Sequence, residues 1–120
     1  MNQDLPGRVA LITGAGAGIG RETALQMAAR GAIVCVNDLK EELVTPVVDA
    51  IRASGGQAFA IVQNISTREG MREAIQRFTS SSRAAFRRAL PRLLTGINRK
   101  ERTASAKETR LRLRLKFLAR

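Results

Sequence analysis

Thr13-Gly14-Ala15-Gly16-Ala17-Gly18-Ile19-Gly20 is the most informative segment of this chain. It follows an apolar run at residues 9–12 and precedes a segment of helical composition at residues 21–30. A strand, a glycine-rich turn and a helix in this order place backbone N–H groups and a helix N-terminus against a phosphate. Glycine suits the turn because a Cβ would crowd the phosphate and because glycine accepts positive φ. The stretch therefore predicts a nucleotide-binding loop.

The spacing of the glycines distinguishes between two known nucleotide-binding patterns. The common dinucleotide-binding pattern Gly-x-Gly-x-x-Gly fails, because Ile19 stands where its third glycine would fall. The pattern that fits is Thr-Gly-x-x-x-Gly-Ile-Gly, and in it the chain resembles the short-chain dehydrogenase/reductase family. The resemblance covers about residues 5–78 and implies a nicotinamide dinucleotide cofactor bound on a doubly wound α/β sheet.

The first two thirds of the chain alternate between strand and helix patterns. Such alternation implies a parallel sheet with right-handed crossovers and the strand order 3-2-1, which is half of a Rossmann-type α/β fold. Gly31 and Gly55-Gly56 are predicted to end the first two helices, and Thr67 is predicted to cap the third. Strands are expected at residues 8–13, 32–37 and 57–63, and helices at residues 19–30, 41–54 and 68–78.

The edges of this half-sheet present a packing problem. Met71, Ala74, Ile75 and Phe78 recur at helical spacing and predict an apolar stripe on the third helix. The first strand should be central, yet no second apolar, β-branched run follows residue 65 to pair with its free side. An uncovered strand edge invites aggregation, and a core from so short a segment is marginal. We therefore expect the folded chain to be poorly stable unless a partner chain completes the sheet.

Charge divides the chain near Phe78. The sequence has 21 Lys and Arg against 10 Asp and Glu, a formal net charge of +11. The two signs balance within residues 1–78, so the whole excess of positive charge lies in residues 79–120. We predict a partial dinucleotide-binding domain at residues 1–78 and a basic tail, disordered or partly helical, at residues 79–120.

The tail itself combines three patterns. Residues 84–94 have helical spacing interrupted by Pro91, residues 95–109 are polar like a linker, and residues 111–118 alternate as a strand with one basic face. Three origins of the tail are considered. It is an out-of-frame, mis-spliced or truncated reading of a GC-rich gene, or it is a basic segment that binds nucleic acid or an anionic surface. The third alternative is a divergent continuation of the α/β fold. The tail offers few aromatic side chains for stacking on bases.

The resemblance places the cofactor at the ends of the strands. Asp38 ends the second strand, where a carboxylate can accept both hydroxyls of the adenosine ribose and repel a 2′-phosphate. Ala17 adds none of the positive charge that relatives preferring NADP often carry near this position, so NAD is predicted over NADP. The alternative for Asp38 is a helix N-cap or a solvated turn. The predicted cofactor-binding residues are Gly14, Gly16, Ala17, Gly18, Ile19, Gly20, Asp38, Leu39, Asn64 and Ile65.

Two of these segments bear on the branch of the family. Asn64-Ile65-Ser66 stands where the family usually has Asp, then Val or Leu, then Ser or Thr, in contact with the adenine. An amide carbonyl can still accept from the adenine amino group, and the alternative is a plain turn residue at the strand end. Asn37-Asp38-Leu39 is similar to a segment of some hydroxyacyl-CoA and hydroxysteroid branches.

The family's catalytic residues have no counterpart in the sequence. The resemblance implies a Tyr-x-x-x-Lys pair with a Ser, in which the tyrosine is the general acid and base. The chain has no Tyr and no His, and the Asn-Asn-Ala-Gly segment expected on a fourth strand is missing. No catalytic residue and no metal site is predicted. The resemblance implies hydride transfer between the nicotinamide and a secondary alcohol or ketone. Without the catalytic residues, we expect this chain to be inactive by itself. The alternative is a non-enzymatic binding module.

Composition limits the remaining possibilities. At 120 residues the chain is at most one domain. Its single cysteine, Cys35, lies in an apolar strand pattern and is predicted to be a packed thiol rather than a nucleophile. No apolar stretch is long enough to span a membrane, and the start is not a secretory signal, so the cytoplasm is expected. The substrate and the oligomeric state are not predicted.

Overall fold

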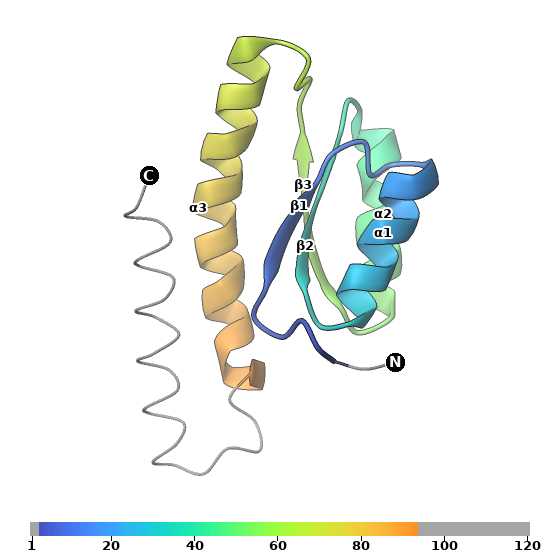
Figure 1. Ribbon diagram of the computed structural model, residues 1–120, viewed down its shortest axis with the longest axis vertical. Coiled ribbons are helices and arrows are strands. Elements are labelled where there is room, and N and C mark those ends of the chain that lie inside the picture. Colours follow the sequence, from blue (N-terminus) through green and yellow to red (C-terminus); the bar gives the residue numbers. More distant parts are fainter. Residues whose placement is uncertain (1–2, 94–120) are drawn as a thin grey trace. The chain divides into compact units, whose positions relative to one another are not determined.

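The computed structural model describes residues 3–93, in which strands and helices alternate strictly (Figure 1). The contacts between residues divide the chain into two compact units, Met1–Arg88 and Ala89–Arg120. The sheet belongs to the first unit. The patterns at residues 95–109 and 111–118 lie outside the described residues. The strands are β1 (Val9–Ile12), β2 (Ile33–Asp38) and β3 (Gln57–Val62), and the helices are α1 (Gly18–Ala29), α2 (Glu41–Ala53) and α3 (Arg68–Leu93).

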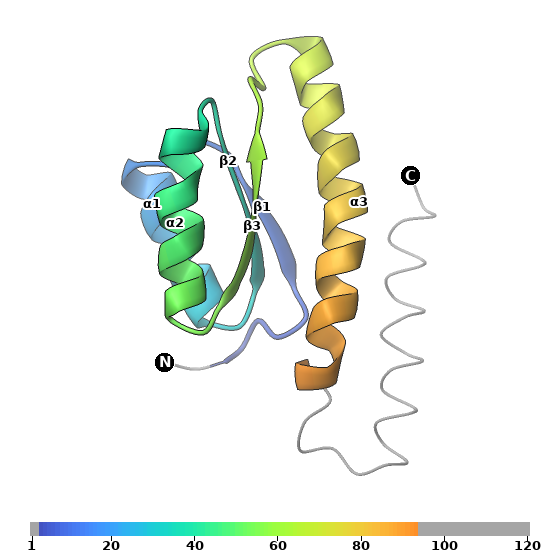
Figure 2. The same ribbon diagram turned by 180° about the vertical axis from the view of Figure 1, so that it is seen from behind.

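The strands form one parallel sheet in the order β1-β2-β3, as expected. The register sets Leu11 opposite Cys35 and Cys35 opposite Phe59, so these side chains share one face of the sheet. Helices α1 and α2 cover the other face, and α3 covers the face of Cys35 (Figures 1 and 2). This is the α/β arrangement of half a Rossmann-type sheet.

Strand β2 is the centre of the core because it is buried on both faces. Val34 and Val36 face α1 and α2, where they pack with Val44, Val47 and other buried residues. The alternate residue, Cys35, packs with Ile61 and Ala74 under α3. A continuous apolar strand is what a parallel sheet covered on both sides requires.

The backbone confirms the predicted ends of the first two helices and the predicted start of the third. Gly31 and Gly55 follow α1 and α2 with φ of 100° and 83°, the left-handed conformation that glycine adopts without strain. The hydroxyl of Thr67 accepts a hydrogen bond from the backbone N–H of Gly70 at 3.0 Å, which makes Thr67 the N-cap of α3.

The expected end of the third helix at Phe78 is wrong, since α3 continues to Leu93. No glycine interrupts residues 79–93, and the polar side chains there are accommodated within the helix. The hydroxyl of Thr79 donates to the carbonyl of Ile75 at 2.9 Å, and the hydroxyl of Ser82 donates to the carbonyl of Thr79 at 3.1 Å. Pro91, expected to interrupt the helical pattern, instead lies inside the last turn of α3.

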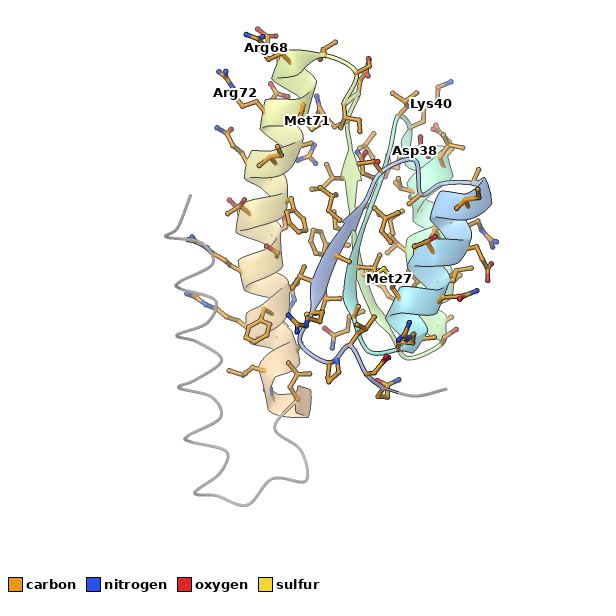
Figure 3. The ribbon with its side chains drawn as sticks, in the orientation of Figure 1. Met27, Asp38, Lys40, Arg68, Met71 and Arg72 are labelled. Atoms are coloured by element: carbon orange, nitrogen blue, oxygen red, sulfur yellow. The ribbon has the colours of Figure 1, made fainter. Side chains whose placement is uncertain are left out.

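The apolar stripe on α3 is only half buried. Ala74 is buried and Phe78 stacks on Phe59 with ring centroids 6.4 Å apart. Met71 and Ile75 are 40% and 44% exposed, and Figure 3 shows Met71 on the first turns of α3. Within the described residues β1 pairs with β2 alone, so the sheet under α3 ends at β1 and no strand lies beyond it to cover the rest of the stripe.

Cys35 is expected to be inert in the folded chain. Its thiol is fully buried, and burial raises its pKa from 9.0 to about 12, with a small opposing effect of the Arg77 charge. A thiol reagent at pH 8 should react with Cys35 only after urea is added.

The same burial makes the stability of the chain depend on pH, because the pKa of the thiol is higher in the folded chain than in the unfolded one. This group should leave the free energy of unfolding unchanged below pH 9 and lower it as the pH rises from about 9 to about 12. A Cys35→Ala chain should lack this part of the pH dependence in urea titrations, and rapid labelling of the native thiol would contradict its burial.

Candidate cofactor-binding site

The loop between β1 and α1 is built for close approach of a ligand to the backbone. Gly14 and Gly18 have φ of 62° and 57°, and a Cβ at either position would enter open space. Glycine is therefore required there by conformation rather than by crowding within the protein. Gly20 differs, because a Cβ at that position would lie 2.5 Å from the carbonyl oxygen of Gly14. The loop consequently lies tightly against the first turn of α1.

The N-terminus of α1 has no side-chain cap. The N-cap residue is Ala17, whose methyl group makes no capping hydrogen bond, and the first turn contains no acidic residue. The first N–H groups of a helix have no partner within the helix and carry a partial positive charge. This end of α1 is therefore suited to an anion, and a diphosphate provides the acceptors that the helix lacks.

Asp38 stands at the carboxyl end of β2, beside the glycine loop (Figure 3). One carboxylate oxygen, Oδ2, accepts a hydrogen bond from the backbone N–H of Gly16 at 2.9 Å. The other, Oδ1, accepts from the N–H of Leu39 at 2.8 Å. The alternative in which Asp38 caps a helix is not what the structure shows, since the N-cap of α2 is Lys40 and makes no side-chain capping bond. Asp38 as a whole is half-buried rather than enclosed in the core.

Asn37 positions the ends of the strands, a role that was not predicted from the sequence. Its side chain is buried, and its amide nitrogen donates to the carbonyls of Ile61 at 2.8 Å and Gln63 at 3.3 Å. Its own backbone carbonyl accepts from the N–H of Ala15 at 3.0 Å. Asn37 thus connects the ends of all three strands. A polar residue inside an otherwise apolar strand, directly before the strand end, was the available signal.

Asn64 forms a local turn after β3. Its side-chain oxygen accepts from the N–H of Ser66 at 2.9 Å and from the Ser66 hydroxyl at 2.6 Å. This side-chain oxygen, which was predicted to accept a hydrogen bond from adenine, is therefore already bonded within the turn. Asn64 is exposed, so its amide nitrogen is the group left to donate to a ligand. Ile65 packs its side chain toward the core cluster under α3.

Large apolar side chains lie exposed at this end of the sheet, and Ile19 and Leu39 are the most exposed of them. Ile19 is 89% exposed in the first turn of α1, and Leu39 is 58% exposed directly after Asp38. Exposed apolar residues next to polar backbone groups are typical of ligand sites. The described residues contain no cluster of three or more His, Cys, Asp or Glu that would hold a metal ion. None of the helices in the described part has the length and apolarity needed to cross a membrane.

The loop, the uncapped helix and the carboxylate together resemble a dinucleotide site, and comparison with known proteins identifies the family. A family model described as short chain dehydrogenase matches residues 8–84. The chain belongs to the short-chain dehydrogenase family. The match extends past Phe78 into the part of α3 that continues beyond the predicted helix end.

Two dehydrogenases and one solved structure that match the chain are all longer than the chain itself. The chain is 45% identical over 76 residues to a cyclohexanol dehydrogenase of Acinetobacter sp. (strain SE19), covering 63% of this chain and 30% of that protein. It is 47% identical over 68 residues to the 7alpha-hydroxysteroid dehydrogenase of Escherichia coli (strain K12), covering 57% and 27%. A crystal structure of hydroxysteroid dehydrogenase from Escherichia coli matches with a TM-score of 0.64 at 41% identity, over 68% of this chain and 34% of that chain. This short-chain dehydrogenase sequence thus spans about a third or less of these relatives.

Proposed function

We propose that this chain is the NAD-binding half of a short-chain dehydrogenase that transfers a hydride between the nicotinamide and a secondary alcohol or ketone. The observation that supports this most is the N-terminus of α1, which has no capping side chain and no acidic residue in its first turn. It lies next to a glycine loop whose Gly14 and Gly18 leave open space where a Cβ would otherwise stand. A diphosphate would accept hydrogen bonds from these N–H groups.

The remaining predicted residues form the proposed adenosine side. Asp38 would accept from the ribose hydroxyls with the lone pairs that Gly16 and Leu39 do not use. A 2′-phosphate would bring negative charge against this carboxylate, so we propose NAD rather than NADP. Leu39, Asn64 and Ile65 would line the adenine, with the Asn64 amide nitrogen as a donor.

The names of the relatives suggest a class of substrate, which we propose only for a complete enzyme that contains this chain. Relatives of this chain are named for cyclohexanol and for a 7alpha-hydroxysteroid, which are both alicyclic secondary alcohols. The sequence itself has no Tyr, so the Tyr-x-x-x-Lys pair that resemblance implies for catalysis is not supplied by this chain. We propose that the chain binds cofactor and does not turn over substrate by itself.

Calorimetric titration of the full 120-residue chain with NAD and with NADP tests the binding proposal. We expect NAD to bind at least about tenfold more tightly than NADP, because one unfavourable charge contact costs on the order of 1.4 kcal/mol. Tighter binding of NADP would refute the role of Asp38, and a folded chain that binds neither would refute the site. In a parallel assay with NAD and cyclohexanol, steady production of NADH would refute the proposed inactivity.

A further inference from the structure

We propose that Asp38 is a positioning residue for the glycine loop, in addition to the contact with ribose that the proposed function gives it. Its two carboxylate oxygens are both bonded to backbone N–H groups without any ligand. The bond to Gly16 joins residues 22 positions apart, so it ties the loop after β1 to the end of β2. A carboxylate that accepts from backbone N–H groups forms charge-assisted bonds, which are stronger than neutral ones.

The loop is shaped to receive this carboxylate. A Cβ on Gly16 would lie 2.7 Å from Asp38 Oδ2 and 2.7 Å from the Cβ of Leu43, so any larger residue would push the loop away from both. A second bond runs in parallel, from the N–H of Ala15 to the carbonyl of Asn37 at 3.0 Å. The loop is therefore held to the end of β2 by one backbone bond and one carboxylate bond.

The end of β2 is itself braced on its other side. The N–H of Gln63 donates to the carbonyl of Asp38 at 3.0 Å, and the buried amide of Asn37 donates to carbonyls at the end of β3. Asp38 consequently joins the glycine-rich loop to a strand end that is itself bonded to β3. A glycine loop has a large conformational freedom to lose on binding, so a bond that orders it in advance lowers the cost of binding a diphosphate.

This role makes a distinct prediction from ribose contact alone. If Asp38 only accepted from ribose hydroxyls, its removal would weaken ADP and leave a ligand without those hydroxyls unaffected. If Asp38 orders the loop, its removal weakens both. The discriminating pair of ligands is ADP and 2′,3′-dideoxy-ADP, titrated against the parent chain, Asp38→Ala and Asp38→Asn.

We expect Asp38→Ala to bind 2′,3′-dideoxy-ADP about tenfold more weakly than the parent chain, as the loss of one charge-assisted bond implies. Asp38→Asn keeps one side-chain oxygen that can accept from Gly16, so it should recover part of that loss. Asp49→Ala is the matched control, because Asp49 is an exposed carboxylate on α2 outside the site, and it should bind like the parent. Unchanged affinity of Asp38→Ala for the dideoxy ligand would overturn the proposal.

A measurement without any nucleotide separates this proposal from the proposed function on which its ligand test rests. Amide hydrogen exchange of the ligand-free chain should be about tenfold faster at Gly16 in Asp38→Ala than in the parent and in Asp49→Ala, with Asp38→Asn in between. Amides in the centre of β2 should stay protected in all four chains, which shows that the fold is intact. Equal exchange at Gly16 in all four would refute the loop contact, even if NAD binds; faster exchange in a chain that binds no nucleotide would refute the cofactor site alone.

Discussion

Replacing Gly70 by alanine is expected to lower the free energy of unfolding by about 3 kcal/mol, enough to unfold much of so small a domain. Gly70 lies in the first turn of α3, where a Cβ would overlap the backbone carbonyl oxygen of Asn64 and lie 2.8 Å from the Thr67 hydroxyl. Neither can move freely, since Asn64 begins the turn between β3 and α3 and Thr67 caps the helix. The measurement is urea denaturation followed by far-ultraviolet circular dichroism, because the chain has no Trp or Tyr.

The sign of this change is as informative as its size. Alanine normally stabilises a helix relative to glycine by about 1 kcal/mol, so an uncrowded site would give a more stable chain. A Gly70→Ala chain that resisted urea better than the parent would therefore contradict the close packing of α3 against the end of β3. The control is Glu73→Ala on an exposed position of the same helix, which should stay within about 0.5 kcal/mol of the parent.

Replacing Gly20 by alanine is expected to weaken NAD binding about 100-fold. A Cβ at Gly20 would lie 2.5 Å from the Gly14 carbonyl oxygen and 3.1 Å from the Cα of Ala15, so the loop must move away from the N-terminus of α1. That movement separates the loop N–H groups from those of the helix, and the proposed diphosphate needs both. A loss of about 100-fold corresponds to about 2.8 kcal/mol, within the range of overpacking effects.

Calorimetric titration with NAD measures this effect, with circular dichroism to show that the variant is folded. Gln26→Ala on the exposed face of α1 is the control, and its affinity for NAD should equal that of the parent chain. A folded Gly20→Ala chain with undiminished affinity would mean that NAD, if it binds, does not use this loop. Loss of binding in Gln26→Ala as well would point to destabilisation of α1 rather than to the loop.

Much of the fold could be predicted from local patterns. The β-branched run before Asp38 predicts a buried strand, and the paired glycines after α2 predict its end, because both signals depend on residues adjacent in sequence. The family could also be recognised from the spacing in Thr13–Gly20, since the backbone conformation of this loop allows little besides glycine at Gly14 and Gly18.

The length of α3 could not be predicted in the same way. The change of composition after Phe78 indicated the end of a structural segment, yet helix formation depends on whether each residue finds partners in the preceding turn. Thr79 and Ser82 find them in carbonyls of that turn. The sequence did indicate an uncovered edge beside the first strand, but which side chains of the α3 stripe stay exposed there, Met71 and Ile75, depends on how α3 packs on the sheet.

Local sequence patterns were enough to predict a strand, a glycine loop and a helix suited to a phosphate, and the composition shows that the chain has no Tyr. The hydrogen bonds of Asp38 could be found only in the folded chain. Its bond to Gly16 spans 22 positions and exists because parallel strands bring their carboxyl ends to one edge of the sheet. A pattern read along the chain records which groups are present, whereas hydrogen bonds between distant segments depend on strand register, which packing of the whole core sets.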